Sequence, residues 1–319
     1  MLWLSSTKPL TAIAIAQQHE RGGVGWNEPV MRYLPEFGQG GKESITIRHL
    51  LMHTAGFRSA DRIPDELPWD ETIAQICAAP LEPGWIPGRQ AGYQIVSSWF
   101  ILAEIVRRLD GRSFDRYVRD EIFLPLGMND SWIGIPPERF RGYADRIAPM
   151  YATDIRPPRP IPLWNTEKGC AICRPASNGR GPIRELGRFY EWLLHPEGMA
   201  ILKPETVREL VQRHRVGLFD HTFQHVIDWG LGFIINSNRW GAETVPYGYG
   251  RYASPDTFGH SGAQSSSAFA DPVHELVVTW ALNGMPGERA HQKRAREINS
   301  ALYEDLGLVA ASSRGGSEK

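Results

Sequence analysis

The sequence has few cysteines, almost no net charge and no long hydrophobic run, and each shortage excludes a class of protein. Three cysteines in 319 residues are too few for a disulfide scaffold. With 35 basic and 36 acidic residues, the chain has no basic block for nucleic acid and no acidic tail. No apolar run reaches the roughly 18 residues that a membrane helix needs. We therefore expect neither a nucleic-acid partner nor a membrane span.

What the chain does have is enough apolar sequence for one large core or two lobes, since 42% of its residues are hydrophobic. The most informative stretch is the first sixteen residues, which contain Ser5-Ser-Thr-Lys8 and then an apolar run to Ala16. A helix that is apolar on nearly every side belongs inside a domain. We expect Ser5 to cap this helix, Pro9 to lie in its first turn and Gly22 to end it.

The spacing of Ser5 and Lys8 also has chemical meaning. Residues three apart share one face of a helix, so the Lys8 ammonium can reach the Ser5 hydroxyl. A buried lysine with a lowered pKa can take the proton of a serine and make it nucleophilic. Alone, S-x-x-K is a weak signal, and a capped helix with a surface lysine is then the favoured interpretation.

The start of the chain allows two interpretations. Four residues before Ser5 are too few for a secretory signal. Either the protein begins here, which favours a cytoplasmic location, or this is a fragment whose upstream part is missing.

The order of the expected elements favours an α+β fold with an antiparallel sheet. Expected helices cover residues 44–53, 70–79, 96–109, 114–123, 183–194, 204–214 and 288–306. Expected strands cover 229–235, 258–262, 265–270 and 275–282, and residues 310–319 are expected to be a disordered tail. Strands grouped late in the chain exclude a Rossmann-type or α/β-hydrolase sheet, which needs alternating strands and helices. The segment Gly259–Gly262 also does not match the G-x-S-x-G elbow of α/β-hydrolases.

Two further features have competing interpretations. Cys170 and Cys173 lie in the proline-rich segment 132–182, where C-x-x-C suggests a redox or metal pair. Because no second pair completes a zinc site, a loop disulfide or two buried thiols is favoured. His53, at the end of an expected helix, is interpreted as a structural hydrogen-bonding residue rather than a catalytic one.

Several motifs in order resemble one family. They are Ser5-Ser-Thr-Lys-Pro-Leu-Thr-Ala12, Ile47-Arg-His-Leu-Leu-Met-His-Thr-Ala-Gly-Phe57, Ile122-Phe-Leu-Pro-Leu-Gly-Met128 and Gly259-His-Ser-Gly262. Together they resemble the serine β-lactamase and penicillin-binding-protein superfamily, most closely its class C, D-aminopeptidase and family VIII esterase branch. The resemblance implies a β-lactamase/transpeptidase-like fold, with an antiparallel sheet flanked by helices and a mostly helical lobe.

The resemblance also implies roles for particular residues. Ser5 matches the acylated nucleophile, Lys8 its base partner, and Tyr93 the tyrosine that shuttles protons. His260-Ser261-Gly262 takes the place of the K-T-G motif. The backbone N–H groups of Ser5 and Ala263 would form the oxyanion hole. Nearby cations would acidify Tyr93. No metal or organic cofactor is implied. Outside this context, Tyr93 would be read as a core tyrosine and His260 as a turn histidine.

Three departures from the family pattern qualify these expectations. Tyr93-Gln94-Ile95 lacks the asparagine of the usual Tyr-x-Asn. His260 replaces a lysine, which weakens the grip on a substrate carboxylate and favours esterase-like or peptidase-like branches. The helix and first two strands that family members carry before the serine are missing, so the strand 275–282 would become an apolar sheet edge, prone to aggregation.

The resemblance favours one catalytic domain with two lobes. Residues 1–34 and 226–309 would form the sheet lobe with the nucleophile helix, and residues 35–225 the helical lobe. The favoured activity is a carboxylesterase or acyltransferase of small hydrophobic acyl groups, with a small-molecule ester, amide or peptide as partner. A β-lactamase or D-amino-acid peptidase, or a non-catalytic sensor of the same fold, remain alternatives. The aromatic stretch 240–252 is interpreted either as a wall of the acyl pocket or as a solvent loop.

Overall fold

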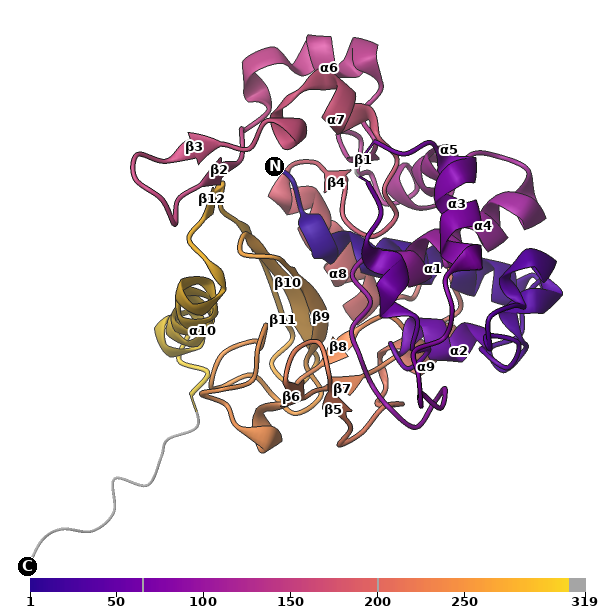
Figure 1. Ribbon diagram of the computed structural model, residues 1–319. Coiled ribbons are helices and arrows are strands. Elements are labelled where there is room, and N and C mark those ends of the chain that lie inside the picture. Colours follow the sequence, from indigo (N-terminus) through magenta and orange to yellow (C-terminus); the bar gives the residue numbers. More distant parts are fainter. Residues whose placement is uncertain (65, 200, 310–319) are drawn as a thin grey trace, which may run out of the picture.

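The computed structural model describes residues 1–64, 66–199 and 201–309 (Figure 1). The expected tail 310–319 lies outside the described residues. In the described part, a central helix passes between a five-stranded sheet and a group of helices (Figure 1). None of the described helices is both long and apolar enough to cross a bilayer.

The central helix begins differently from the expectation. A 3₁₀ turn, η1 (Leu4–Thr7), precedes α1 (Lys8–Glu20), and Ser5 lies inside this turn without capping the helix through its side chain. The prediction of a Ser5 cap is therefore wrong. The other features are as expected: α1 is buried from Lys8 to Gln18, Pro9 lies in its first turn, and Gly22 follows its end with φ +77°. Glycine adopts this left-handed conformation without steric cost.

Most of the remaining helices lie around α1 or cover the sheet, whereas α6 (Pro137–Tyr143) and α7 (Glu167–Ala171) pack against each other at one end of the molecule (Figure 1). The others are α2 (Ile47–Leu51), α3 (Trp69–Ala78), α4 (Ser97–Asp110), α5 (Phe114–Val118), α8 (Ile183–Leu194), α9 (Pro204–Val211) and α10 (Glu288–Asp305). The helices expected at 70–79, 96–109, 183–194 and 288–306 are confirmed to within a residue at each end.

Three of the expected helices differ from the structure in their ends. The helix expected from residue 44 starts later, because Thr46 caps it and forms a capping box with His49. The helix expected over 114–123 is α5 followed by a π turn (Arg119–Phe123). The helix expected over 204–214 ends at Val211.

The main sheet is antiparallel, with the order β11-β10-β9-β8-β7. Its strands are β7 (Asp228–Trp229), β8 (Ile234–Ile235), β9 (Phe258–Gly262), β10 (Ser266–Asp271) and β11 (Leu276–Ala281). The strand expected over 229–235 is instead the hairpin of β7 and β8. Smaller pairings join β1 (Trp132–Ile133) to β4 (Gly179–Arg180), β5 (Phe219–Asp220) to β6 (His225–Val226), and β2 (Tyr151–Ala152) to β3 (Arg159–Pro160) and β12 (Gly284–Met285).

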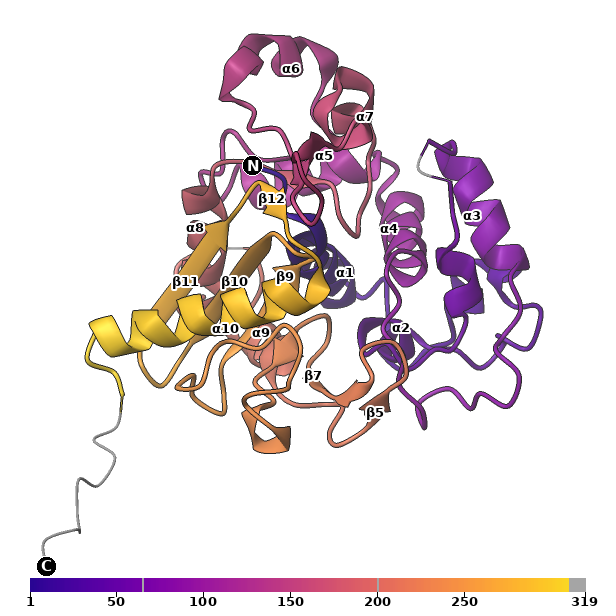
Figure 2. The same cartoon turned by 60° about the vertical axis from the view of Figure 1, so that its left-hand side comes forward.

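Helices cover both faces of the main sheet. α8 packs against β10 and β11, and α10 crosses the opposite face (Figure 2). One contact fixes α10, since the Trp280 indole N–H donates to Asn299 Oδ1 at 2.8 Å. β11 is one of the two edge strands of this sheet in the described residues, as expected, and β7 is the other. The division into lobes at residues 34/35 and 225/226 stays a prediction.

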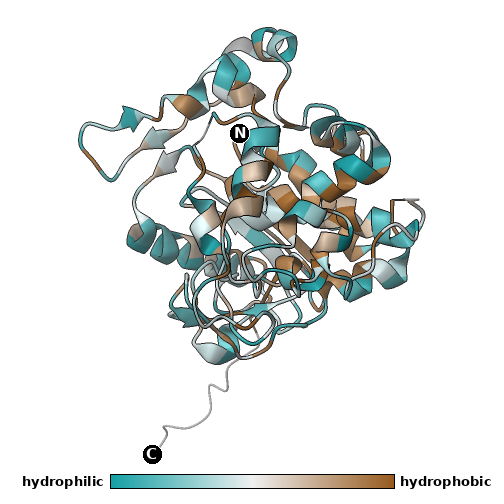
Figure 3. Cartoon of the chain, turned by 45° about the vertical axis from the view of Figure 1, so that its right-hand side comes forward, coloured by the Kyte–Doolittle hydropathy of each residue, from teal (hydrophilic) through white to brown (hydrophobic). Residues whose placement is uncertain are grey.

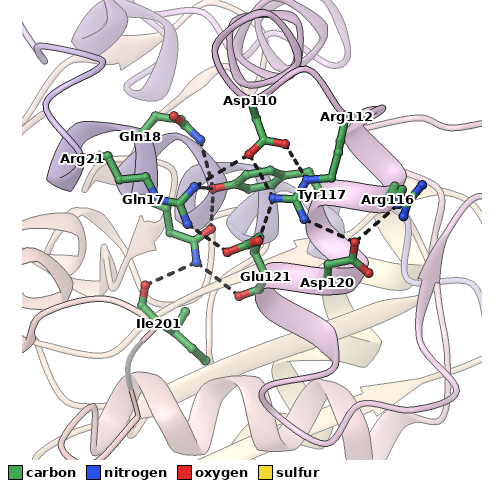
Figure 4. A network of polar contacts seen from close by, with 10 residues as sticks. All are labelled: Gln17, Gln18, Arg21, Asp110, Arg112, Arg116, Tyr117, Asp120, Glu121 and Ile201. Atoms are coloured by element: carbon green, nitrogen blue, oxygen red, sulfur yellow. Dashed lines mark hydrogen bonds and ion pairs between the residues drawn. The ribbon is translucent and has the colours of Figure 1, made fainter.

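Hydrophobic residues gather in the middle of the molecule, where α1 packs against α4 (Figure 3). The far end of α1 is held by polar contacts (Figure 4). The Tyr117 hydroxyl donates to Gln17 Oε1 at 3.0 Å and accepts from Gln18 Nε2 at 3.1 Å and Arg21 Nη1 at 3.2 Å. Arg21 also pairs with Glu121 at 2.9 Å. These contacts anchor the helix that positions Ser5 and Lys8 at its other end.

Candidate active site

Ser5 and Lys8 meet at the start of the central helix. Lys8 Nζ donates to Ser5 Oγ at 3.0 Å and to the Ala176 carbonyl oxygen at 3.1 Å. The Lys8 side chain is fully buried, and burial lowers its pKa from 10.5 to about 7. A lysine in this state gives up its proton near neutral pH. The pair can therefore transfer a proton from the serine to the lysine.

The turn that carries Ser5 is tied to the strand β9. Ser6 Oγ donates to the His260 carbonyl oxygen at 3.0 Å, and Ser266 Oγ donates to the Trp3 carbonyl oxygen at 2.7 Å. Leu4 has a φ of +50°, a strained value for leucine, immediately before the candidate nucleophile. A Cβ on Gly262 would lie 2.2 Å from the Trp3 carbonyl oxygen. Only glycine therefore lets β9 pass this close to the Ser5 turn.

The two N–H groups expected to form an oxyanion hole border the same cavity. Ser5 and Ala263 both line a cavity of about 390 Å³. Within the described ranges, neither residue donates its N–H in a backbone hydrogen bond outside the regular elements. Free donors of this kind can stabilise a developing negative charge. The close approach of β9 to η1 at Gly262 is what sets the two residues side by side.

Tyr93 lies over the same pair of side chains. It lines the same cavity as Ser5, and Lys8 Nζ lies 5.1 Å from the centre of its ring. Burial raises the pKa of Tyr93 far above its ordinary value of 10. The expected acidification of Tyr93 is therefore wrong: desolvation outweighs the nearby cation, and the phenol keeps its proton.

Side chains from distant segments hold the backbone around Tyr93. Asp220 Oδ1 accepts from the Tyr93 N–H at 3.0 Å, and the buried Arg215 pairs with Asp220 at 3.1 Å. His53 Nδ1 accepts from the Gln94 N–H at 2.9 Å. This contact confirms the structural role predicted for His53. Asp220 and Arg215 were not among the residues singled out from the sequence.

A third acceptor fixes the next turn of the same loop. Asp61 accepts from the N–H groups of Ile95 at 2.7 Å, Val96 at 3.0 Å and Ser97 at 2.8 Å. Asp61 therefore caps α4 from 34 to 36 residues away in the chain. The sequence carried no signal for this cap, because Asp61 belongs to a different segment from the helix that it caps.

His260 belongs to strand β9 and lies next to Tyr93. Its imidazole ring is neutral. Its Nδ1 donates to the Ser261 carbonyl oxygen at 2.9 Å, since a carbonyl can only accept. Burial and the Lys8 charge lower the pKa of His260 to about 3. Its Nε2 then carries a lone pair, which has no hydrogen-bond partner in the described structure. His260 cannot offer a substrate carboxylate the charge of the lysine that it replaces.

The remaining lining of the cavity is mainly apolar or aromatic. Ile95, at the position where the resemblance led us to expect an asparagine, lines it together with Phe223 and Ile234. From the aromatic stretch 240–252, only Pro246 and Tyr247 do so. Trp240 instead donates its indole N–H to Asp228 at 3.1 Å. The stretch therefore supplies part of the wall, and its other aromatic residues pack elsewhere.

Cys170 and Cys173 are free thiols, so the expected loop disulfide is not formed, and the alternative of two thiols describes them better. Cys170 is buried, whereas Cys173 is partly exposed. In the part of the chain that the structure describes, no group of three or more His, Cys, Asp or Glu residues is placed to hold a metal ion.

A model of the family described as Beta-lactamase matches residues 1–303. The chain is 26% identical over 313 residues to the esterase/beta-lactamase LipL of Mycobacterium tuberculosis (strain ATCC 25618 / H37Rv), covering 87% of this chain and 67% of that protein. It is 26% identical over 271 residues to the esterase EstB of Burkholderia gladioli, covering 72% and 64%. A solved penicillin-binding protein homolog from Caulobacter crescentus matches with a TM-score of 0.76 and 28% identity, over 96% of this chain and 83% of that one.

The fold and the pairing of a serine with a buried lysine are those of a serine hydrolase with a β-lactamase/transpeptidase-like fold. The chain belongs to the β-lactamase family. It spans about two thirds of the length of the two curated relatives, 67% of one and 64% of the other.

Proposed function

We propose that this chain hydrolyses carboxylic esters through an acyl-enzyme on Ser5. The observation that carries the proposal is the 3.0 Å hydrogen bond between Ser5 Oγ and Lys8 Nζ, a lysine whose pKa of about 7 suits a base at neutral pH. Neutral Lys8 takes the proton of Ser5 as Oγ forms a bond with the ester carbonyl carbon. The N–H groups of Ser5 and Ala263 stabilise the resulting oxyanion.

Tyr93 acts in this proposal as a proton relay. Because its hydroxyl stays protonated, it donates to the leaving alcohol oxygen as the C–O bond breaks, and Lys8 returns the proton. Water then attacks the acyl carbon and passes a proton through Tyr93 to Lys8. As the bond between this carbon and Ser5 Oγ breaks, Lys8 gives the proton to Oγ, and the carboxylic acid leaves. With an alcohol in place of water, the same steps give acyl transfer.

An ester with a small hydrophobic acyl group fits the lining better than an anionic substrate does. The cavity is bordered by Ile95, Phe223 and Ile234, and no Lys or Arg is among its described lining residues. Substrates with a free carboxylate, such as penicillins and D-alanyl peptides, would find no cation there. The names of the two curated relatives, an esterase/beta-lactamase and an esterase, both include ester hydrolysis.

The test combines covalent labelling with turnover. A fluorophosphonate probe should add one label to the parent protein, and peptide mapping should place it on Ser5. The Ser5→Ala variant should take no label and should lose hydrolysis of p-nitrophenyl butyrate, whereas Ser59→Ala, at an exposed serine, should behave like the parent. A Ser5→Ala protein that keeps the parent rate would refute the proposal.

Two other outcomes would point to the alternative functions. Turnover of nitrocefin or of a D-amino-acid peptide without ester turnover would show a β-lactamase or peptidase. A label on Ser5 with no turnover of any ester would show a binding or sensor protein that has kept the nucleophile.

A further inference from the structure

The cavity at Ser5 has an acidic rim. Glu288, the first residue of α10, lines it together with Gln292 from the next turn of that helix. Of the described residues that line this cavity, only Glu288 carries a formal charge, because His260 is neutral. Arg289 and Lys293 line a neighbouring surface depression, which shares Glu288 and Gln292 with the cavity, but they do not border the cavity itself. The residues that line the cavity therefore present one negative charge and no positive one, while Lys8 lies behind Ser5 and is neutral when it acts as the base.

Neutral donors hold the Glu288 carboxylate in place. Tyr247 donates its hydroxyl to Oε2 at 2.7 Å, and Gln264 Nε2 donates to Oε1 at 3.2 Å. Gln292 Nε2 adds a longer contact to Oε2 at 3.4 Å. Within the described ranges, Glu288 forms no ion pair with a Lys, Arg or His side chain. Since a carboxylate offers about four lone-pair sites, Oε1 can accept another donor.

Aromatic rings connect Glu288 to the reacting groups. The ring centres of Tyr93 and Phe223 are 4.6 Å apart, and those of Phe223 and Tyr247 are 5.8 Å apart. Tyr247 then holds Glu288. The faces of aromatic rings attract cations, and the combination of rings with a carboxylate suits an ammonium group. We call Tyr93, Phe223, Tyr247 and Glu288 the aromatic–acidic wall.

His260 supplies a second, independent acceptor on the same cavity. It is only 1% exposed, and its Nε2 has no partner among the described residues. Because its Nδ1 donates to the Ser261 carbonyl, Nε2 can only accept a hydrogen bond while the ring is neutral. Apart from the two N–H groups assigned to the oxyanion hole, the open polar atoms of Glu288 and His260 on this cavity are both acceptors, which suits a ligand that carries positive charge.

We propose that the cavity selects esters whose alcohol part carries an ammonium group, and that Glu288 determines this specificity. The proposal rests on the ester hydrolysis proposed above. The alcohol side is assigned because Tyr93, which gives its proton to the leaving oxygen, begins the aromatic–acidic wall that ends at Glu288. The cationic group would lie against Phe223 and Tyr247 with its charge toward the carboxylate.

Two esters that differ only in charge test the proposal. Butyrylcholine and 3,3-dimethylbutyl butyrate have the same acyl group and nearly the same shape, and they give the same acyl-enzyme. Their ratio of kcat/KM therefore reports acylation alone, and because choline is also the better leaving alcohol, recognition of the charge is assigned by comparing this ratio between the parent and Glu288→Gln. For the parent, we expect a two- to five-fold preference, roughly, for the choline ester, because Glu288 is solvent-exposed at the rim. This preference should weaken as salt is added.

Variants assign the preference to Glu288. Glu288→Gln should lower the ratio of kcat/KM values to about the ratio of a site that does not recognise the charge. Glu297→Gln should keep the parent ratio. Glu297 lies on the same helix but pairs with Arg251 at 2.8 Å and does not border the cavity. An equal ratio in the parent and in Glu288→Gln would overturn the inference.

The two proposals can fail separately. If Ser5→Ala abolishes hydrolysis of both esters while the parent shows no preference for the cation, only the specificity assignment fails. If the parent turns over neither ester, or if Ser5→Ala keeps the parent rate, the ester hydrolysis proposal fails and the specificity proposal fails with it.

Discussion

Replacing Lys8 by methionine should abolish ester hydrolysis and, below neutral pH, make the protein more stable. Methionine has nearly the length of lysine but carries no charge. A pKa lowered from 10.5 to about 7 means that protonated Lys8 costs about 5 kcal/mol more in the folded chain than in the unfolded one. The variant removes this cost. It also removes the hydrogen bonds to Ser5 and the Ala176 carbonyl, which offsets about 1–3 kcal/mol of the gain.

The pH dependence gives the sharper measurement. Between about pH 7 and 10.5 the unfolded chain keeps the Lys8 proton and the folded chain does not, so the parent gains stability as pH rises through this window. The methionine variant lacks this contribution. The stability difference between the two proteins should therefore shrink by about 2–3 kcal/mol between about pH 6 and pH 9. The hydrogen bonds that the variant loses alter the stability difference at each pH, but they have little effect on how much this difference changes between pH 6 and pH 9.

The assay is equilibrium unfolding in guanidinium chloride at both pH values, followed by tryptophan fluorescence. Lys203→Met is the matched control, because Lys203 is solvent-exposed, and its difference from the parent should not change with pH. A Lys8→Met difference that stays constant between the two pH values would refute the assignment of Lys8 as a buried group with a lowered pKa. It would also remove the main physical support for Lys8 as the base.

Three further predictions test other parts of the site. The kcat/KM for a neutral ester should rise with pH to a plateau above about 7, as Lys8 loses its proton; a profile that stays flat through that region would contradict the base role. Gly262→Ala should lose fluorophosphonate labelling, since its Cβ would lie 2.2 Å from the Trp3 carbonyl oxygen, whereas Gly142→Ala, with open space around it, should label normally. Tyr117→Phe should lower the free energy of unfolding by about 1–3 kcal/mol without changing the labelling, as measured by denaturant midpoints.

The contact between Ser5 and Lys8 could be predicted from the sequence because it is local. A spacing of three residues in a helical turn brings the two side chains together whatever the rest of the chain does. The helix ends marked by Gly22 and Gly111 were predictable for the same reason, since each glycine adopts the left-handed conformation that follows a helix. The start of the central helix was not, because η1 adds a turn whose position depends on β9 and β10, more than 250 residues away.

The surroundings of Tyr93 could not be predicted because nothing local determines them. The acceptor for the Tyr93 N–H comes from Asp220, 127 residues away, and the acceptor for the Gln94 N–H comes from His53, 41 residues away. Asp220 can accept this hydrogen bond as a buried carboxylate only because the buried Arg215 balances its charge. Each of these residues is ordinary in its own segment, and their common role appears only when the segments meet.

The charge states of the site show why a nearby cation is a poor guide to a buried phenol. Burial disfavours whichever form of a group is charged, so it lowers the pKa of a lysine and raises that of a tyrosine. Lys8 and Tyr93 share one buried site, and their pKa values shift in these opposite directions. The lysine can then be neutral near pH 7 while the tyrosine keeps its proton. The environment that fits Lys8 for accepting the Ser5 proton thus prevents Tyr93 from doing so, which favours Lys8 as the base and leaves Tyr93 the part of a proton relay.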